Sequence, residues 1–265
     1  MQVTAGTRAL ITGASRGIGR ALAAALAARG ATVGLAARST HELDELAAEL
    51  PGAHQTLECD VADAASTQAA VDRFAERAGG LNLLIANAGI AHYGSFAAQP
   101  LEDKLRMSQV NWHGTLHTVH FGLPHLLEAR SGHIVIVSSG AGLRSFPQAA
   151  VYGATKAAQR AFGEALRHEL AGTGVSLTVV YPGEIATALH DHEKERMPPW
   201  YRGGTSAAPP NRLADRVIKA IENDERAVHY PPIVRALGIA HGLNPKAADA
   251  LLRRLRGESA APRRG

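Results

Sequence analysis

The chain has 265 residues, of which 46% are hydrophobic and 20% charged, and these values are typical of one soluble globular domain. Its net charge of +4, with no basic run interleaved with aromatic residues, argues against nucleic acid as a partner. The single cysteine, Cys59, excludes an internal disulfide and a cysteine-based zinc site. No signal-like start and no apolar run of membrane-spanning length occur, so we expect a cytoplasmic protein.

A short apolar strand followed by a glycine cluster opens the chain. Residues 7–11 predict the strand, and residues 20–28, rich in alanine and leucine, predict a helix. The glycines between them have the spacing Gly-x-x-x-Gly-x-Gly. A strand, a glycine turn and a helix in this order indicate a loop that binds the pyrophosphate of a dinucleotide. The candidate cofactor-binding residues of this loop are Gly13, Ser15, Arg16, Gly17, Ile18 and Gly19.

The end of the next strand indicates which dinucleotide binds. Residues 31–36 predict this strand, after which come Ala37 and Arg38. Proteins that prefer NAD place an acidic residue here for the ribose 2′-hydroxyl. Arg38 can instead hold a 2′-phosphate with two hydrogen bonds, and Arg16 can assist it. We therefore predict NADP(H) rather than NAD(H), the alternative being that both arginines are solvated surface residues.

The following stretch predicts a helix over 39–50, a strand over 54–57, a helix over 64–77 and a strand over 81–85. Asp60-Val61 follows the first of these two strands, and Asp60 has two interpretations of equal weight. One is a contact with the cofactor, and the other is the N-cap of the helix 64–77. The second strand ends in Ala86-Asn87-Ala88-Gly89.

A long helix is predicted over residues 101–128. Asn111 lies in its middle, where an asparagine is unfavourable unless tertiary contacts require it. His113, His117 and His120 lie near one face of the same helix. Zinc is conceivable there, but no acidic residue accompanies the histidines, so we interpret them as packing or interface residues and predict no metal.

The strand predicted over 133–137 leads to the most informative residues of the chain. Ser138 and Ser139 stand at its carboxyl end, where ligands bind in open α/β sheets. A helix that continues to about residue 170 then carries Tyr152 and Lys156, four positions apart and hence on one face. A cation beside a tyrosine lowers the pKa of the phenol, which can then exchange a proton with a carbonyl or alcohol oxygen.

These residues resemble the active-site pattern of the short-chain dehydrogenase/reductase family. In that family the serine precedes the tyrosine by thirteen positions, which selects Ser139 over Ser138. The resemblance implies that Tyr152 is the acid/base, that Ser139 anchors the substrate oxygen, and that Lys156 shifts the tyrosine pKa and holds the ribose. It also implies that Asn111 completes a tetrad, because its carbonyl binds a water of the proton relay.

The same resemblance assigns further cofactor contacts. Asp60 and Val61 would contact the adenine, and the turn at Asn87, Ala88 and Gly89 would lie against the cofactor, although the family has a second asparagine in place of Ala86. A strand is predicted over 175–180, and the residues after it resemble the segment that holds the nicotinamide carboxamide. The candidates in this segment are Pro182, Gly183, Ile185 and Thr187.

The remaining third of the chain is less regular. Residues 188–212 correspond to the substrate lid of the family, and Trp200 and Tyr201 either cover an apolar substrate or anchor the loop. His190 to Glu193 is a polar run that we interpret as solvated. A helix is predicted over 211–223 and a strand over 227–230.

Beyond this strand the chain departs from the compact family pattern. Leucines and isoleucines recur over 231–256 at helical spacing among basic residues. Three interpretations stay open, namely a helix over the substrate mouth, an oligomer contact, and an interfacial helix on a membrane, the last being least favoured. Residues 257–265 read as a disordered basic tail.

The predicted fold is therefore α/β, a single doubly wound Rossmann-type domain over 1–265, with a mostly parallel seven-stranded sheet flanked by helices. The predicted function is NADP(H)-dependent interconversion of a small-molecule ketone or aldehyde and an alcohol, in a homodimer or homotetramer. The alternatives are a membrane-associated reductase of long-chain or lipid-like ketones and an inactive nucleotide-binding protein on the same fold.

Overall fold

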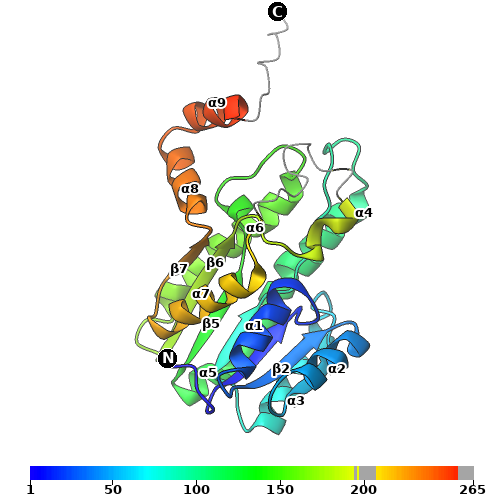
Figure 1. Ribbon diagram of the computed structural model, residues 1–265, viewed down its shortest axis with the longest axis vertical. Helices are drawn as coiled ribbons and strands as arrows, with labels where there is room; N and C mark the ends of the chain where they lie inside the picture. The colour runs from blue at the N-terminus through cyan, green and yellow to red at the C-terminus, as the bar shows by residue number, and fades with distance from the viewer. Residues whose placement is uncertain (194–195, 197–206, 256–265) are drawn as a thin grey trace, which may run out of the picture.

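Seven parallel strands form one sheet in this computed structural model, which describes residues 1–193, 196 and 207–255 (Figure 1). The strands are β1 (Arg8–Thr12), β2 (Thr32–Ala37), β3 (Gln55–Glu58), β4 (Leu83–Ala86), β5 (Gly132–Val137), β6 (Val175–Pro182) and β7 (Ala227–Tyr230). Their order is β3-β2-β1-β4-β5-β6-β7. Successive strands are added on one side of β1 up to β3 and on its other side from β4 onward. The position between β1 and β4 is therefore a topological switch point, where doubly wound sheets bind ligands. The predicted fold class is confirmed.

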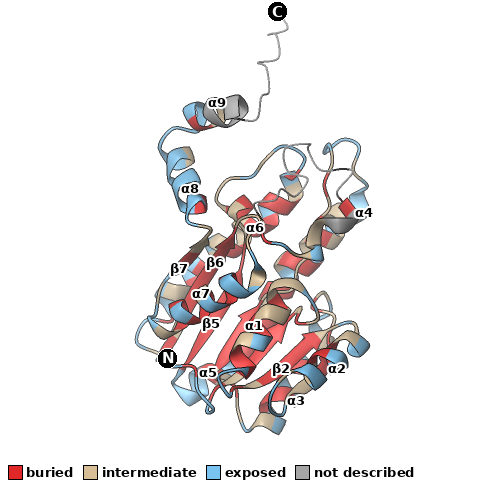
Figure 2. Ribbon diagram, in the orientation of Figure 1, coloured by how far each residue is buried: buried red, intermediate tan, exposed pale blue. Residues whose placement is uncertain are grey.

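Helices cover both faces of this sheet (Figure 2). One face packs on α1 (Gly17–Ala27), α2 (Thr40–Glu49) and α7 (Pro210–Glu222), and the other on α3 (Ala64–Ala78), α5 (Gly114–Ala129) and α6 (Ala150–Glu169). The strands read as continuous apolar runs because side chains on both of their faces are buried. In β1, for example, Ile11 belongs to one core and Leu10 to the other, and both are fully buried.

The helix predicted over 101–128 has three parts. These are α4 (Leu101–Met107), a π-helix η1 (Ser108–His113) and α5, and they follow one another without a break. Asn111 lies within the π-helical turn and is fully buried. Extra residues of this kind in a helix often mark functional sites, since they rotate a side chain out of the regular helical register. Here the buried residue in the π-helical turn is one of the four proposed for the tetrad.

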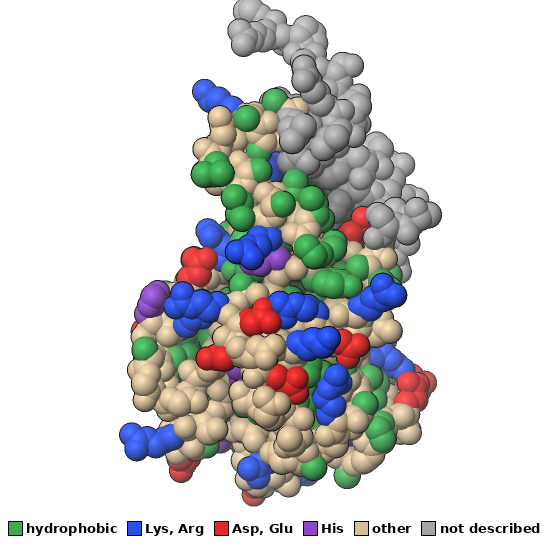
Figure 3. Space-filling view, turned by 60° about the vertical axis from the view of Figure 1, so that its left-hand side comes forward, with side chains coloured by type: hydrophobic (Ala, Val, Ile, Leu, Met, Phe, Trp, Pro, Cys, Tyr) green, Lys and Arg blue, Asp and Glu red, His purple; other side chains and the backbone are tan. Residues whose placement is uncertain are grey.

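Two helices occupy the segment beyond β7, α8 (Ile233–Leu243) and α9 (Pro245–Leu255). They project from the carboxyl end of the sheet and form an arm (Figure 1). Val234 is buried beside Gly140 and Gly183, so the base of the arm packs on the body of the protein. Further out, α8 exposes large apolar side chains, which Figure 3 shows above the body of the molecule. They are Ile233, Leu237, Ile239 and Leu243.

An ion pair fastens the arm to the loop that follows β5. Arg144 donates to Asp249 of α9 at 2.7 and 3.3 Å, and Leu143 lies against Gly238 of α8. No helix within the described part of the chain has both the length and the hydropathy to cross a bilayer. The predictions for Trp200, Tyr201 and the tail 257–265 lie outside the described residues.

Candidate active site

A cavity of about 450 Å³ opens at the carboxyl ends of the strands, beside the switch point. Its volume is in the range of cofactor and small-molecule sites. Every residue that the sequence nominated for catalysis or cofactor binding lines this cavity except Gly19 and Asn111. The fold thus gathers side chains from the glycine loop, from the ends of β2 to β6 and from α6 into one place.

The glycine loop has the backbone geometry that a dinucleotide requires. Gly13 and Gly17 adopt φ angles of +68° and +57°, which residues with a Cβ rarely do. A Cβ on Gly17 would stand 3.3 Å from the Thr187 side chain, and one on Gly19 would collide with the Gly13 carbonyl. The loop therefore stays open enough for a pyrophosphate to approach the N-terminus of α1, which begins at Gly17 rather than at the predicted residue 20.

The turn after β4 is tied to the glycine loop from the other side. Asn87 donates through its side-chain amide to the carbonyls of Thr12 and Gly13, both at 3.0 Å. Gly89 lies where a Cβ would be 3.4 Å from the Lys156 ammonium and 3.3 Å from the Asn111 amide oxygen. A side chain at this position would crowd both groups, which explains why a glycine suits it.

The wall nearest the end of β2 carries opposing charges. Arg16 and Arg38 are exposed at the cavity, and Glu42 of α2 lines it beside them. Glu42 had no counterpart among the sequence predictions, because it stands in the first turn of the helix rather than at the end of the strand. The sequence predicted only the two arginines in this wall, and the structure adds the Glu42 carboxylate to them.

Asp60 is bound by two groups at this wall. It accepts hydrogen bonds from Arg106 of α4 at 2.9 Å and from the Ala62 amide at 3.0 Å. Partial burial acts to raise the pKa of Asp60, but these bonds and the charge of Arg38 outweigh it and hold the pKa below its usual value. The helix 64–78 is capped by Asp63 instead, so the N-cap interpretation of Asp60 was wrong.

Tyr152, Lys156 and Ser139 meet at the centre of the cavity. Tyr152 and Lys156 are both 4% exposed on α6, and the Lys156 ammonium lies 5.9 Å from the centre of the Tyr152 ring. It donates to the Val137 carbonyl at 3.0 Å. Ser139 lines the cavity with Tyr152, and its hydroxyl accepts from the Ala141 amide at 3.1 Å. Ser138, by contrast, donates to the main chain of Lys156 at 2.8 Å and fixes α6 against β5.

The two pKa shifts at this centre differ from the sequence expectation. Burial raises the pKa of Tyr152, while the Ser139 side chain acts in the opposite direction. Burial also lowers the pKa of Lys156, to about 7. The expected lowering of the tyrosine pKa is therefore not found in the protein by itself, because burial of the phenol outweighs the effect of Ser139.

Asn111 supports the site from behind the cavity wall. Its side-chain amide binds both main-chain groups of Ile90, at 2.8 and 3.0 Å, and donates to Thr155 at 3.1 Å. Its main-chain carbonyl accepts from Thr115 at 2.8 Å and from Gln159 at 2.9 Å. A carbonyl has two lone pairs, so a relay water at this oxygen has to replace one of these donors. Sequence reasoning did not consider Gln159.

The segment after β6 folds onto the substrate end of the cavity. Its short helix η3 (Ala188–Glu193) places His190 in the cavity wall, and Glu193 is 2% exposed. The Glu193 carboxylate accepts from the Tyr93 amide at 3.1 Å and pairs with His92 at 2.9 Å. The prediction of a solvated polar run was therefore wrong for Glu193, because its partners come from a loop about a hundred residues away.

The histidines of η1 and α5 lie outside the cavity. His117 contacts the Val61 carbonyl at 2.9 Å, and the His120 ring packs edge-on against Phe121. Across the described ranges, no group of three His, Cys, Asp or Glu side chains is arranged to hold a metal ion.

Comparisons with known proteins agree with this geometry. The family described as short chain dehydrogenase matches residues 7–198. An uncharacterized oxidoreductase of Myxococcus xanthus is 40% identical over 184 residues, which are 68% of this chain and 73% of the relative. A short chain dehydrogenase/reductase of Burkholderia phymatum, solved in complex with NAD, has a TM-score of 0.84 at 27% identity and covers 93% of this chain and 96% of its own. An alcohol dehydrogenase of Thermococcus sibiricus, complexed with 5-hydroxy-NADP, has a TM-score of 0.74 at 27% identity over 84% and 94% of the two chains.

Proposed function

For this chain, which belongs to the short chain dehydrogenase family and is an oxidoreductase acting on CH–OH groups, we propose an NADP(H)-dependent reaction that interconverts a small ketone or aldehyde and its alcohol. The observation that carries the proposal is the buried Tyr152 phenol, which shares the cavity with the Ser139 hydroxyl and has the Lys156 ammonium 5.9 Å from the centre of its ring. A buried phenol, a hydroxyl donor and a cation suit proton transfer to an oxygen.

Each of the three side chains has one task in this reaction. The Ser139 hydroxyl donates a hydrogen bond to the substrate oxygen and holds it beside Tyr152. Tyr152 gives its proton to that oxygen in reduction and takes it back in oxidation. Lys156 favours the phenolate whenever it carries its charge. A nicotinamide held in this cavity would supply or accept the hydride, and its oxidised ring would add a positive charge to the site.

The residues that would hold the cofactor fit it in shape and in charge. The open glycine loop would take the pyrophosphate, and Pro182 to Thr187 would hold the nicotinamide carboxamide. For the 2′-phosphate, Arg16 and Arg38 offer two guanidinium groups against one carboxylate from Glu42. The other nearby carboxylate, Asp60, is already paired with Arg106. This balance supports NADP(H) over NAD(H).

Replacement of Tyr152 by phenylalanine tests the reaction. Tyr152→Phe removes the proton donor and keeps the ring that packs beside Tyr93. We expect kcat/KM for a ketone to fall about 10²- to 10⁴-fold while NADPH still binds, as measured by reduced-cofactor absorbance and by fluorescence titration. Tyr181→Phe, a buried tyrosine outside the cavity lining, is the matched control. Turnover near the wild-type value in Tyr152→Phe would refute the assignment.

A second candidate, reduction of lipid-like ketones at a membrane surface, is favoured only by the exposed apolar side chains of α8. Ile239→Glu and Leu243→Glu place charges on this surface. If the candidate is correct, both variants lose co-sedimentation with vesicles of mixed neutral and anionic lipid. The wild-type protein staying in the supernatant would exclude it.

Self-association is the proposed assembly, as a homodimer or homotetramer. Family members typically form oligomers, and α5 carries partly exposed aromatic and histidine side chains on its outer face. Light scattering during size-exclusion chromatography measures the molar mass against the 27.8 kDa of one chain. A mass of one chain at micromolar concentration would contradict the proposal.

A further inference from the structure

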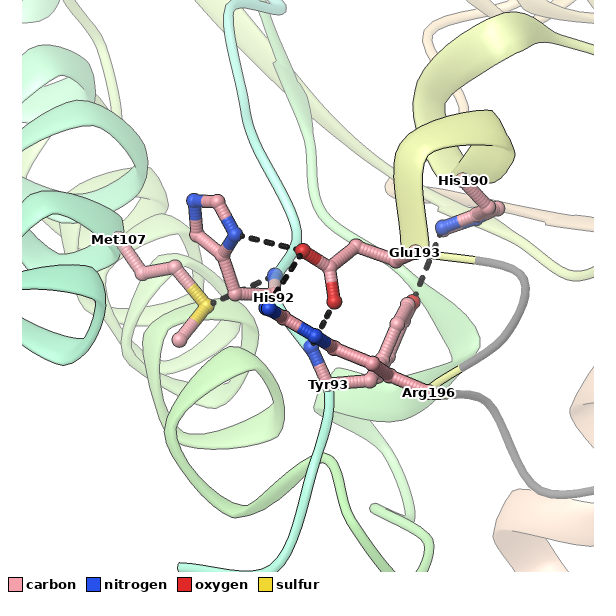
Figure 4. Close-up of polar contacts among 6 residues, drawn as sticks. All are labelled: His92, Tyr93, Met107, His190, Glu193 and Arg196. Carbon is pink, nitrogen blue, oxygen red and sulfur yellow. Dashed lines mark hydrogen bonds and ion pairs between the residues drawn. The ribbon is translucent and has the colours of Figure 1, made fainter. Parts of the chain in front are cut away.

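The side chain of His190 lines the cavity, where a hydrogen bond and a ring contact with Tyr93 orient it. We propose that His190 is a specificity-determining residue, which binds an oxygen substituent close to the reacting carbonyl, so that hydroxyketones are favoured over plain ketones. This inference rests on the proposed function, because it names the substrate class of the same site. The residues involved are drawn in Figure 4.

The position of His190 is the first step. It lines the same cavity as Ser139 and Tyr152, and it is half-buried. Apart from Ser139 and Lys156, Tyr152 belongs to a mainly apolar cluster that includes Ile90, Tyr93 and Leu189. A polar side chain in such a wall fixes the orientation of a ligand and decides which substituents it accepts.

Tyr93 fixes the orientation of the His190 ring. Its hydroxyl lies 3.0 Å from His190 Nδ1, and the two ring centres are 5.6 Å apart. Tyr93 is 1% exposed and packs edge-on against Tyr152, with ring centres 5.9 Å apart. The buried Tyr93 ring therefore fixes the position of the imidazole relative to the acid/base Tyr152. When the Tyr93 hydroxyl donates to Nδ1, the proton of the neutral imidazole lies on Nε2, which then acts as a donor.

Glu193 anchors the short helix that carries His190. A buried carboxylate is costly unless it is paired and hydrogen-bonded, and Glu193 meets both conditions through the Tyr93 amide and His92. Arg196 lies 3.6 Å from the same carboxylate. Figure 4 shows these groups converging between the loop of His92 and Tyr93 and the end of η3. The loop is held in turn by the Met107 sulfur, which accepts from the His92 amide at 3.3 Å.

Two roles follow from this arrangement. His190 contacts the substrate, whereas Tyr93 and Glu193 act through it as positioning residues. The imidazole lines the cavity of Tyr152 and contacts the Tyr93 ring, which packs on Tyr152, so a substrate in this cavity can present an oxygen substituent to it. Loss of one such hydrogen bond changes affinity by about 2- to 10-fold.

The experiment compares three small ketones, butan-2-one, 3-hydroxybutan-2-one and 4-hydroxybutan-2-one, with NADPH in excess. The readout is the ratio of kcat/KM for each hydroxyketone to that for butan-2-one. Because the ratio is compared between variants, the intrinsic reactivity of each ketone cancels. We expect His190→Phe to lower the ratio by about 2- to 10-fold for at least one hydroxyketone, mostly through KM.

Further variants separate a specific role from damage to the fold. His190→Asn keeps a donor and retains part of the preference. Glu193→Gln weakens the anchor, so it lowers the ratio less than His190→Phe does. His41→Asn, on an 82% exposed side chain, and Glu164→Gln, on a 51% exposed one, are matched controls in which the ratio stays unchanged.

The outcomes are distinguishable. Turnover of the ketones with an unchanged ratio in His190→Phe overturns this inference and leaves the proposed function intact. A lowered ratio in His190→Phe that His190→Asn partly restores supports it. Absence of turnover of every ketone by the wild-type protein overturns both proposals.

Discussion

The two ends of strand β5 each meet a buried titratable side chain, and their surroundings differ. At the amino end, His133 is fully buried and binds Thr178 at 2.8 Å. At the carboxyl end, Lys156 donates to the Val137 carbonyl. Burial is the main cause of the pKa shift at both, lowering His133 to about 4 and Lys156 to about 7.

A lowered pKa alone therefore does not identify a functional residue. His133 lies among core side chains and does not line the cavity, whereas Lys156 lines it next to Tyr152 and Gly89. The same desolvation stabilises a neutral imidazole in the core at one end. At the other end it leaves an amine that gains or loses its charge near neutral pH, beside a phenol that exchanges protons.

Replacement of Lys156 by methionine should have the largest effect on activity. Lys156→Met keeps the length of the side chain and removes its charge. We expect kcat/KM to fall about 10²- to 10⁴-fold, because the phenolate of Tyr152 loses its cation. The midpoint of urea unfolding should stay equal or rise, since an apolar side chain replaces a buried amine. Near-normal turnover in this variant would show that the Lys156 amine, like the His133 imidazole, is not needed for the reaction.

At His133 we expect an effect on stability rather than on activity, and acidification should reveal it. Its pKa is lowered from 6.5 to about 4 in the folded protein, so the unfolded chain binds the proton more readily. The contribution of His133 to stability is complete above pH 6.5 and is lost as the pH falls to 4. The total loss is about 3 kcal/mol of unfolding free energy.

Urea unfolding at pH 7, 6 and 5 measures this loss. In His133→Leu the decline between pH 7 and 5 should be shallower, because one titrating group is missing. His168→Leu, which replaces an exposed histidine near the end of α6, is the control. Identical pH slopes in His133→Leu and wild type would show that the imidazole does not titrate as its burial implies.

The sequence predicted the parts of the site that depend on local pattern. The glycine loop, the end of β5 and the Tyr152–Lys156 face each follow from residues close together in the chain, and the doubly wound parallel sheet follows from alternating strands and helices. The direction of the Tyr152 pKa was not predictable, because it depends on burial by the whole fold. Glu193 and Arg106 were missed for a related reason, since their partners are distant in sequence and no local pattern marks them.

Replacement of Arg38 tests whether the end of β2 recognises the 2′-phosphate of the cofactor. Arg38→Ala removes one guanidinium from the end of β2, so the ratio of kcat/KM with NADPH to that with NADH should fall about 10- to 100-fold. Glu42→Gln should raise the same ratio, because it removes the opposing carboxylate. Arg73→Ala, on the exposed face of α3, is the control. An unchanged ratio in Arg38→Ala would contradict the NADP(H) proposal.

The smallest expected effect concerns the arm at the same edge. Asp249→Ala removes the ion pair with Arg144, whose side chains are 43% and 14% exposed, and the weaker contact with His241 at 3.8 Å. A partly exposed pair of this kind contributes about 1 kcal/mol or less. We expect amide hydrogen exchange in α8 and α9 to accelerate up to about 5-fold, while exchange in β5 and β6 stays unchanged.

The ketone KM of the same variant decides what the arm does. Arg144 belongs to the loop that begins at Ser139, so freeing it shifts the loop only if the ion pair holds the loop in place. A KM that stays within about 2-fold, with faster exchange in the arm, assigns Asp249 to arm docking alone, because the loop keeps its own hydrogen bond from the Ala141 amide to Ser139. A larger rise in KM, absent from the control Glu49→Ala in the remote pair with Arg20, would place the arm within the substrate site.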